Sequence, residues 1–151
     1  PGQKLHSKRN FINRFRAAHE GRWRFDPFDA RDLGELYEYE ARWCRDNRTS
    51  EGDLMAENKA IVSLLENGEA LDVKGGVLRL DGRVIGFSLG TFITPDVFCV
   101  HIEKADWMIA GAYQVLALTG AYLTGPSRTM LQKLAQKYLP DNEPARAGAA
   151  R

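Results

Sequence analysis

The chain has 151 residues, of which 44% are hydrophobic and 27% are charged, with a formal net charge of +1. This length suits one domain with a core of its own, and the composition is ordinary for a soluble globular protein. Cys44 and Cys99 have no metal-binding or redox spacing, so we expect two buried thiols in a reducing cytosol rather than a disulfide. No signal peptide appears. Because the chain begins at Pro1 rather than Met, we expect it to be a piece of a longer protein.

Charge is unevenly distributed along the chain. Residues 1–25 contain seven lysines and arginines against a single acid, whereas residues 26–72 contain thirteen acids against five bases. A basic segment beside an acidic body can bind phosphates or dock on a neighbouring acidic surface, and both interpretations stay open. The segment is predicted to form a helix over 4–19, whose apolar side consists of Leu5, Phe11, Ile12, Phe15 and Ala18.

Capping and turn residues divide the rest of the chain into short elements. Asp29 is suited to cap a helix, and Ser50 with Asp53 resembles a capping box for the next one. The uncharged stretch 107–126 follows a strand pattern, so we expect a buried helix of an α/β fold rather than a membrane span. The expected elements after the first helix are a strand over 22–25, helices from Asp29 and from Ser50, strands over 70–74, 76–81, 83–92 and 96–104, a helix over 109–123, a short helix from Ser127 to Tyr138 and a disordered tail.

The strands carry the densest chemical signal. Asp81-Gly82 between two β-rich runs predicts a tight hairpin, because both turn positions need a positive φ. In the last strand Cys99, His101 and Glu103 follow one another at spacing two, so we expect their side chains on one face. The other face is expected in the core, with Phe98, Val100 and Ile102.

Two interpretations of this face stay open. His101 or Glu103 can accept the proton of an attacking amine or hydroxyl during acyl transfer. Alternatively, His101 is a structural residue that is hydrogen-bonded to a neighbouring strand or to Glu103. No metal site is expected, because spacing two along a strand separates the Cβ atoms by about 7 Å.

The order of elements defines the expected fold class. A helix, a strand, two helices, a meander of antiparallel strands and a helix packed on the sheet make up the first two thirds of the acyltransferase architecture called GNAT. We therefore expect an α/β, more strictly α+β, fold with a mixed, mostly antiparallel sheet flanked by helices and lacking its last strands. Such a sheet has an exposed edge, which favours dimerisation or poor stability.

Two features bear on what this fold binds. Gly86, Ser88 and Gly90 give one strand a face of small residues, which suits either a slot for a substrate chain or close packing. GNAT enzymes that use coenzyme A have a Gln/Arg-x-x-Gly-x-Gly/Ala turn after the fourth strand, whose amides hold the pyrophosphate. Residues 104–112 lack that glycine pair, and Asp106 puts a negative charge where the diphosphate would lie. Acetyl-CoA is therefore disfavoured, and no other cofactor is expected.

Four short segments stand out together: residues 8–15 (KRNFINRF), 74–76 (KGG), 101–106 (HIEKAD) and 111–114 (GAYQ). Over about residues 4–115, the chain resembles the C-terminal domain of phosphatidylglycerol lysyltransferases, which also occurs in stand-alone soluble bacterial relatives. The resemblance implies a tandem of two GNAT-like units, of which this chain is the second together with the connecting helix. It implies aminoacyl-tRNA as the co-substrate and, in the lysyltransferases, the glycerol hydroxyl of a lipid as the acceptor.

The candidate site residues fall into three groups. His101 and Glu103 are the expected catalytic, proton-handling pair. The expected substrate-binding residues are Lys74, Gly75, Gly76, Gly90, Lys104, Asp106, Tyr113 and Gln114, among which the two lysines would polarise a carbonyl or contact a phosphate. The residues expected to contact tRNA phosphates or an anionic lipid headgroup are Lys8, Arg9, Asn13 and Arg14.

The expected organisation is a basic connecting helix over 1–20, a GNAT-like domain over 21–124, and a divergent helix with a disordered tail over 125–151. By the same resemblance we expect the first GNAT-like unit to be absent from this chain and the family pattern to end after Val115. The leading hypothesis is a cytoplasmic aminoacyltransferase, with peripheral contact at the inner membrane face as an option. The rival is a non-catalytic binding or regulatory module that kept the fold. The expected partners are aminoacyl-tRNA, an anionic lipid headgroup, the missing unit and a second copy of this chain.

Overall fold

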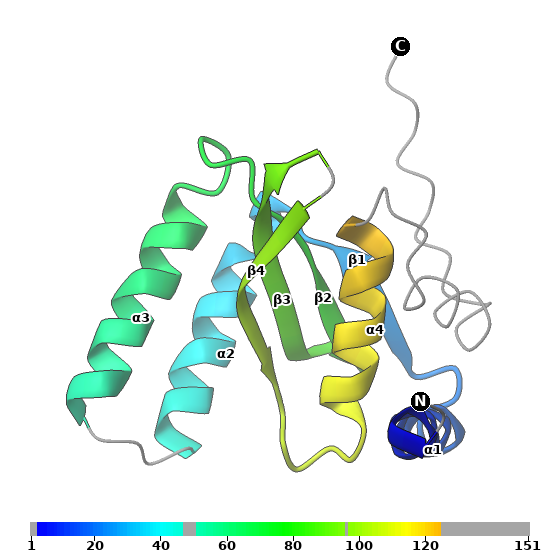
Figure 1. Cartoon of the computed structure of the whole chain (residues 1–151). Coiled ribbons are helices and arrows are strands. Elements are labelled where there is room, and N and C mark those ends of the chain that lie inside the picture. Colours follow the sequence, from blue (N-terminus) through cyan, green and yellow to red (C-terminus); the bar gives the residue numbers. More distant parts are fainter. Residues whose placement is uncertain (1–2, 47–50, 96, 125–151) are drawn as a thin grey trace.

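Four antiparallel strands form one sheet with helices on both of its faces (Figure 1). The computed structural model describes residues 3–46, 51–95 and 97–124; the predicted cap at Ser50 and the predicted helix and tail after residue 124 lie outside this part. The strands are β1 (Trp23–Pro27), β2 (Lys74–Leu80), β3 (Arg83–Thr94) and β4 (Val97–Ala105), in the order β1-β2-β3-β4. The predicted α+β class, with an antiparallel sheet flanked by helices, is confirmed.

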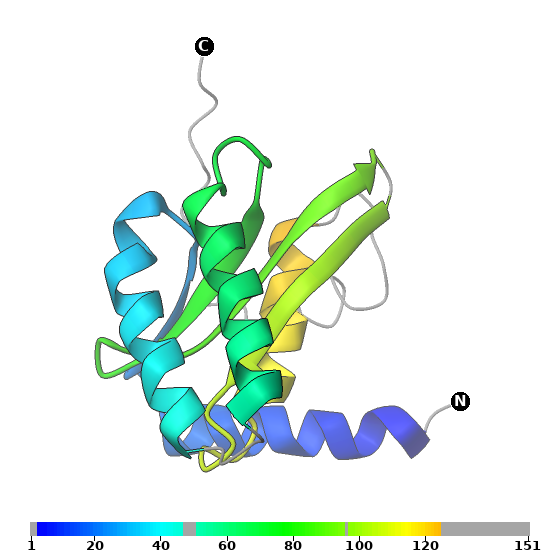
Figure 2. The same cartoon turned by 90° about the vertical axis from the view of Figure 1, so that its left-hand side faces the viewer.

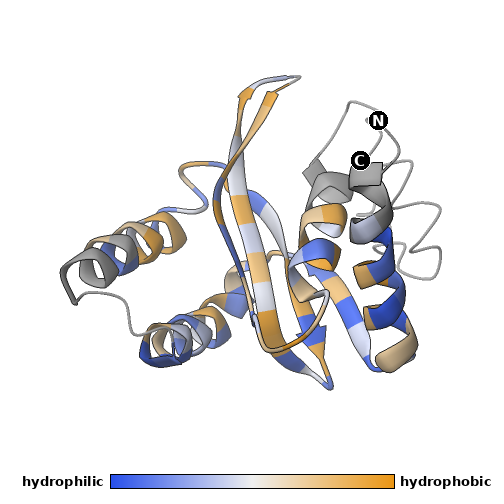
Figure 3. Ribbon diagram, turned by 60° about the horizontal axis from the view of Figure 1, so that its bottom comes forward, coloured by the Kyte–Doolittle hydropathy of each residue, from blue (hydrophilic) through white to orange (hydrophobic). Residues whose placement is uncertain are grey.

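Helices cover the two faces of the sheet in pairs (Figure 3). α2 (Leu33–Asp46) and α3 (Glu51–Glu66) lie on one face, and α4 (Ala112–Thr124) lies on the other with α1 (Gln3–Ala18) beside it. Figure 2 shows α1 running across one end of the molecule. Asp29 caps a short 3₁₀ turn, Ala30–Asp32, because the Asp29 side chain accepts a hydrogen bond from the Arg31 amide. This turn leads directly into α2.

The predicted strand over 70–74 is wrong. After α3 ends, the Leu71 amide donates to the Asn67 carbonyl and the Val73 amide donates to the Gly68 carbonyl, so the chain continues in turns. Asp72 has a φ of 50°, in the left-handed region that a strand does not use. Extended pairing begins only at Lys74. The β2–β3 turn is confirmed, because Asp81 and Gly82 have φ values of 50° and 80°.

Each face of the sheet has its own hydrophobic core. On one face the buried residues come from α1, α4 and all four strands: Ile12, Phe15, Phe25, Leu78, Ile85, Ala105, Ala112, Val115, Leu116 and Leu118. On the other face they come chiefly from α2, α3, β2 and β3: Leu36, Tyr39, Ile61, Leu65, Val73, Val77, Val84, Phe87 and Leu89. The predicted apolar side of α1 is only partly right, because Phe11 is 40% exposed and Ala18 is exposed.

The uncharged stretch after β4 becomes α4, as predicted, and it packs on the sheet. Ala112, Val115 and Leu116 are fully buried in the core of that face. Of the helices within residues 3–46, 51–95 and 97–124, none combines the length and the apolar character needed to cross a bilayer.

Close approach of neighbouring groups explains the glycines of the sheet. A Cβ atom on Gly90 would lie 2.1 Å from the Cys99 carbonyl oxygen, and a Cβ on Gly76 would lie 2.2 Å from the Phe25 ring. A Cβ on Gly86 would lie 2.8 Å from the carbonyl oxygen of Lys104. The space beside these glycines is therefore filled by strands and rings, which favours close packing over a slot for a substrate chain.

We expect Gly90→Ala to destabilise the fold by about 1–3 kcal/mol, because the added methyl forces β3 and β4 apart. Gly34→Ala in α2 is the matched control, since nothing lies within 4 Å of its Cβ position. Alanine there should stabilise the helix by up to about 1 kcal/mol. Urea unfolding of both variants measures the two effects, and equal stability of the two variants would contradict the close approach at Gly90.

Candidate active-site strand and adjoining cleft

A β-bulge in β4 decides where the predicted catalytic side chains point. Leu89 of β3 pairs with Ile102, but the next residue, Gly90, pairs with Val100, so His101 is an extra residue on β4. Such an insertion disrupts the ladder locally and breaks the alternation of side chains along the strand. One consequence is that Val100, which alternation places in the core, is 49% exposed.

The bulge separates the predicted trio. Cys99 pairs with Thr91 and therefore lies on the face that α2 and α3 cover, together with Ile102. Glu103 pairs with Ser88 and lies on the other face. The prediction that Cys99, His101 and Glu103 share a face is therefore wrong for Glu103. In the part of the chain that the structure describes, no three His, Cys, Asp or Glu side chains gather closely enough to hold a metal ion.

His101 is exposed, and both of its ring nitrogens have a neighbour. Nε2 lies 2.8 Å from Thr91 Oγ1, and Nδ1 lies 3.8 Å from Cys99 Sγ. Thr91 belongs to the adjacent strand, so the contact orients the imidazole as the structural interpretation requires. An exposed imidazole that a second group orients is equally what a proton acceptor needs. The contacts fit both interpretations of His101.

Lys104 is a buried ion-pair partner. Its Nζ donates to Glu40 Oε1 of α2 at 2.7 Å and lies 3.8 Å from the centre of the Trp43 ring. The side chains of Lys104 and Glu40 are only 4% and 2% exposed. The ion pair connects the edge strand β4 to the middle of α2. It also keeps the Lys104 ammonium out of solvent, so the ammonium is not placed to contact a phosphate or carbonyl of a bound substrate.

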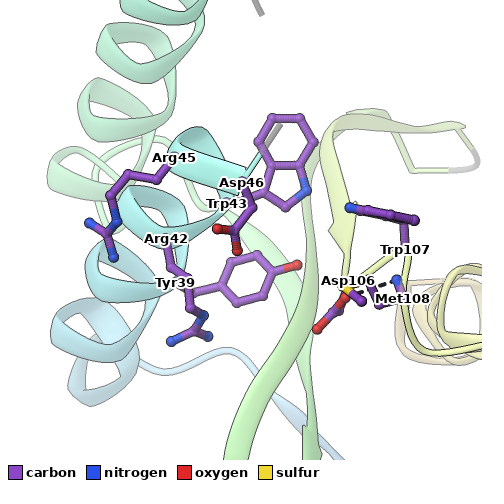
Figure 4. Close-up of a pocket in the computed structure, with 8 residues that line it drawn as sticks. All are labelled: Tyr39, Arg42, Trp43, Arg45, Asp46, Asp106, Trp107 and Met108. Atoms are coloured by element: carbon purple, nitrogen blue, oxygen red, sulfur yellow. Dashed lines mark hydrogen bonds between the residues drawn. The ribbon is translucent and has the colours of Figure 1, made fainter. Parts of the chain in front are cut away.

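A cleft of about 370 Å³ opens beside this ion pair, between α2 and the turn that follows β4 (Figure 4). We call it the α2–turn cleft. The helix contributes Tyr39, Arg42, Trp43, Arg45 and Asp46, and the turn contributes Asp106, Trp107 and Met108. In Figure 4 the hydroxyl of Tyr39 points toward Asp106, while the guanidinium groups of Arg42 and Arg45 lie on the other side of the Tyr39 ring.

The floor of the α2–turn cleft is fixed by contacts with β3. Tyr39 is only 3% exposed, and its hydroxyl donates to the Ile85 carbonyl. Arg42 Nη2 donates to the Val84 carbonyl at 3.2 Å. Arg42 also lies over the Tyr39 ring, 5.4 Å from its centre. Burial raises the pKa of Tyr39, and the negative charge of Asp106 acts in the same direction.

The rim of the cleft is formed by the turn. Asp106 donates from its amide to the Ile85 carbonyl, and its carboxylate accepts from the Met108 amide at 3.0 Å. These two hydrogen bonds hold the first residues of the turn while Trp107 and Met108 stay 63% and 75% exposed.

The other predicted substrate-binding residues lie in two places. Lys74 pairs with Gly90 in the sheet, one strand away from the bulge at His101, and its ammonium pairs with Asp72. Gly75 and Gly76 beside it are buried. Asp106 lies at the far end of β4, roughly 16 Å from His101 at the rise of a strand. Tyr113 and Gln114 lie in the first turn of α4, where they are half-buried.

The basic helix α1 lies against the same turn. A Cβ on Gly111, whose φ is +91°, would lie 2.5 Å from the Phe11 carbonyl oxygen. Asn13 and Arg14 are exposed and Arg9 is half-buried, whereas the side chain of Lys8 lies outside the described ones. The helix that carries the predicted phosphate-binding residues therefore contacts the segment after β4 through Phe11 and Gly111.

Sequence reasoning missed most of the α2–turn cleft, although it named Asp106. The available signal was the spacing of Tyr39, Arg42 and Trp43, which puts an arginine and two aromatic rings on one side of a helix. A second signal was Trp107-Met108, two large apolar residues in a turn. Neither signal indicates that the two segments meet.

The fold defines an α+β domain, and candidate site residues lie along its edge strand β4 and in the turn that follows it. The chain belongs to the family of phosphatidylglycerol lysyltransferase C-terminal domains, whose model matches residues 1–123. The match continues past Val115, where the sequence alone suggested that the resemblance ended.

The chain is similar to a solved structure of a conserved protein of unknown function from Bacteroides thetaiotaomicron VPI-5482. The TM-score is 0.69 at 35% sequence identity, over 77% of this chain and 39% of that one. The chain therefore spans well under half the length of that protein. No curated protein matches significantly.

We expect Lys104→Met to cost about 3–5 kcal/mol, because it leaves the Glu40 carboxylate buried without its cation. The double variant Lys104→Met/Glu40→Leu should recover most of that loss, since no charge remains in the core. Chemical unfolding of both single variants and the double variant forms the thermodynamic cycle. Additive losses in the double variant would show that the two side chains do not interact.

The raised pKa of Tyr39 predicts a loss of stability in alkali. The unfolded chain releases the tyrosine proton near the ordinary pKa of 10, whereas burial keeps the folded group neutral. The free energy of unfolding should therefore fall as the pH rises above about 10. Tyr39→Phe should make this fall shallower in urea titrations at successive pH values; an identical slope in both proteins would refute the assignment.

Proposed function

We propose that this chain is the acyl-transferring domain of an aminoacyltransferase with a GNAT-like fold. It takes the aminoacyl group from aminoacyl-tRNA and passes it to a hydroxyl or amine, which in a phosphatidylglycerol lysyltransferase is the lipid glycerol hydroxyl. The single observation that carries the proposal is the family match over residues 1–123. The exposed imidazole on the edge strand and the exposed basic residues of α1 support it.

His101 is the proposed proton acceptor. It takes the proton of the attacking hydroxyl as the new bond to the aminoacyl carbonyl carbon forms, and it returns a proton to the ribose oxygen as the ester bond to tRNA breaks. Thr91 orients the ring from the neighbouring strand. Glu103 lies on the other face of the sheet, so its proposed share in proton handling is indirect.

Phosphate contacts are proposed for α1. Asn13 and Arg14 are exposed on α1, the helix whose Phe11 backbone contacts Gly111 in the segment after β4. Contacts of this kind release counterions, so the affinity should fall with salt.

The rival is a non-catalytic module that binds the same partners. It is favoured by the contacts of His101 with Thr91 and Cys99, which fit a structural role for the imidazole as well as a catalytic one. The two proposals differ in whether His101 matters for turnover.

We expect the chain to bind charged tRNA more tightly than uncharged tRNA or acetyl-CoA, with weaker binding at higher salt. His101→Ala should keep that affinity while transfer to phosphatidylglycerol vesicles falls about 10²–10⁴-fold, the range for loss of a general base. Arg14→Ala should weaken tRNA binding and lower its salt dependence.

The measurement is filter binding at two salt concentrations, together with transfer of a radiolabelled amino acid. Arg24→Ala, an exposed arginine on β1, is the matched control for Arg14→Ala. Tight acetyl-CoA binding would contradict the proposal. Transfer that survives His101→Ala unchanged would favour a different catalytic group, and tRNA binding without any transfer would favour the non-catalytic module.

A further inference from the structure

We propose that the α2–turn cleft binds one unpaired nucleotide, with its base stacked on Trp107 and its phosphate held by Arg42 and Arg45. The chemistry is that of a nucleobase, a ribose and one phosphate, which a free nucleotide and the single-stranded end of an RNA share. Where that RNA is tRNA, the inference rests on the proposed function and extends it.

The exposed indole of Trp107 points to a stacking ligand. Trp107 and its neighbour Met108 are 63% and 75% exposed and form adjoining apolar surface at the rim of the cleft. Lys104 already occupies one face of Trp43. The indole of Trp107 therefore offers the open aromatic face, and every base can stack on such a face.

The arginines suit a phosphate. Arg42 is held in place by the Val84 carbonyl and the Tyr39 ring, and Arg45 is exposed one turn further along α2. Both guanidinium groups lie on the same side of Tyr39, away from Trp107, as Figure 4 shows. A guanidinium presents several N–H donors in the geometry that phosphate oxygens accept.

The acids and the size limit the ligand to one nucleotide. Asp46 and Asp106 can accept hydrogen bonds from ribose hydroxyls or from a base amino group, and both would repel a second phosphate. The volume of about 370 Å³ is near the lower end of the range for small-ligand sites, about 300–1,000 Å³.

A single-stranded RNA end fits better than a free nucleotide. The segment after β4 that carries Trp107 also contacts the basic helix α1 through Gly111, and Asn13 and Arg14 of that helix are exposed. A basic surface beside an aromatic stacking residue is the usual combination in single-strand binding proteins.

The test uses the whole chain and three probes: the trinucleotide CCA, adenosine 5′-monophosphate and a blunt-ended RNA duplex. We expect CCA to bind most tightly. Trp107→Ala should weaken that binding about tenfold or more, and Trp107→Phe should restore it to within about threefold. Arg45→Ala should weaken binding and reduce its salt dependence. Phe92→Ala and Arg24→Ala are exposed controls outside the cleft and should change nothing.

The outcomes separate the possibilities. Equal affinity for the monophosphate would support the site and make a free nucleotide its ligand. No binding of either single-stranded probe, binding that is indifferent to Trp107→Ala, or Trp107-dependent binding only to phosphatidylglycerol vesicles would each overturn the proposal. Preferred binding of charged tRNA that ignores Trp107 would overturn the cleft and leave the proposed function standing. Trp107-dependent binding of CCA without any aminoacyl transfer would support the cleft and count against the proposed function.

Discussion

The buried contact between Lys104 and Glu40 is the constraint on which the arrangement of the candidate site depends. Two charges are removed from water here, and Glu40 Oε2 has no hydrogen-bond donor among the described residues. A buried ion pair is weak evidence for stability, because well-packed apolar residues often do as well. The clearer effect of this ion pair is geometric, since only one placement of α2 on the edge strand brings the Lys104 ammonium and the Glu40 carboxylate into contact.

That placement connects the two chemically distinct parts of β4. From Lys104 the strand runs back to the bulge that turns His101 toward Thr91, and it runs forward to Asp106 and the turn. The same stretch of α2 that holds Lys104 also supplies Tyr39, Arg42 and Trp43 to the cleft. A shift of α2 by one turn would therefore remove one wall of the cleft and would at the same time separate Lys104 from Glu40. The site is better described as a property of this helix–strand pair than of individual residues.

The sequence predicts the parts of the fold that local chemistry determines. Asp81-Gly82 could be assigned because few residues accept two consecutive positive φ values, and α4 because it carries no charge over its whole length. The turn at 70–74 could not be separated from a strand, because its outcome depends on hydrogen bonds back to the end of α3.

The site is predicted less completely than the fold, and the reason is again physical. Spacing along β4 assumes strict alternation, and a single bulged residue sends Glu103 to the other face from Cys99. Lys104 looks like a contact for substrate in the sequence, because nothing near it in the chain reveals Glu40, which comes 64 residues earlier. The α2–turn cleft was missed for the same reason, since its two walls are far apart in sequence and meet only through tertiary packing.

The central claim is that the ion pair positions α2 on β4, and local amide hydrogen exchange tests it most directly. Lys104→Met should lose protection first in residues 39–46 of α2 and around residue 104 of β4. Protection of the β1–β2 pairing and of α4 on the opposite face should change least at short exchange times, because neither of them contacts Glu40. A uniform rise in exchange over the whole sheet, or unchanged protection of α2, would contradict the claim.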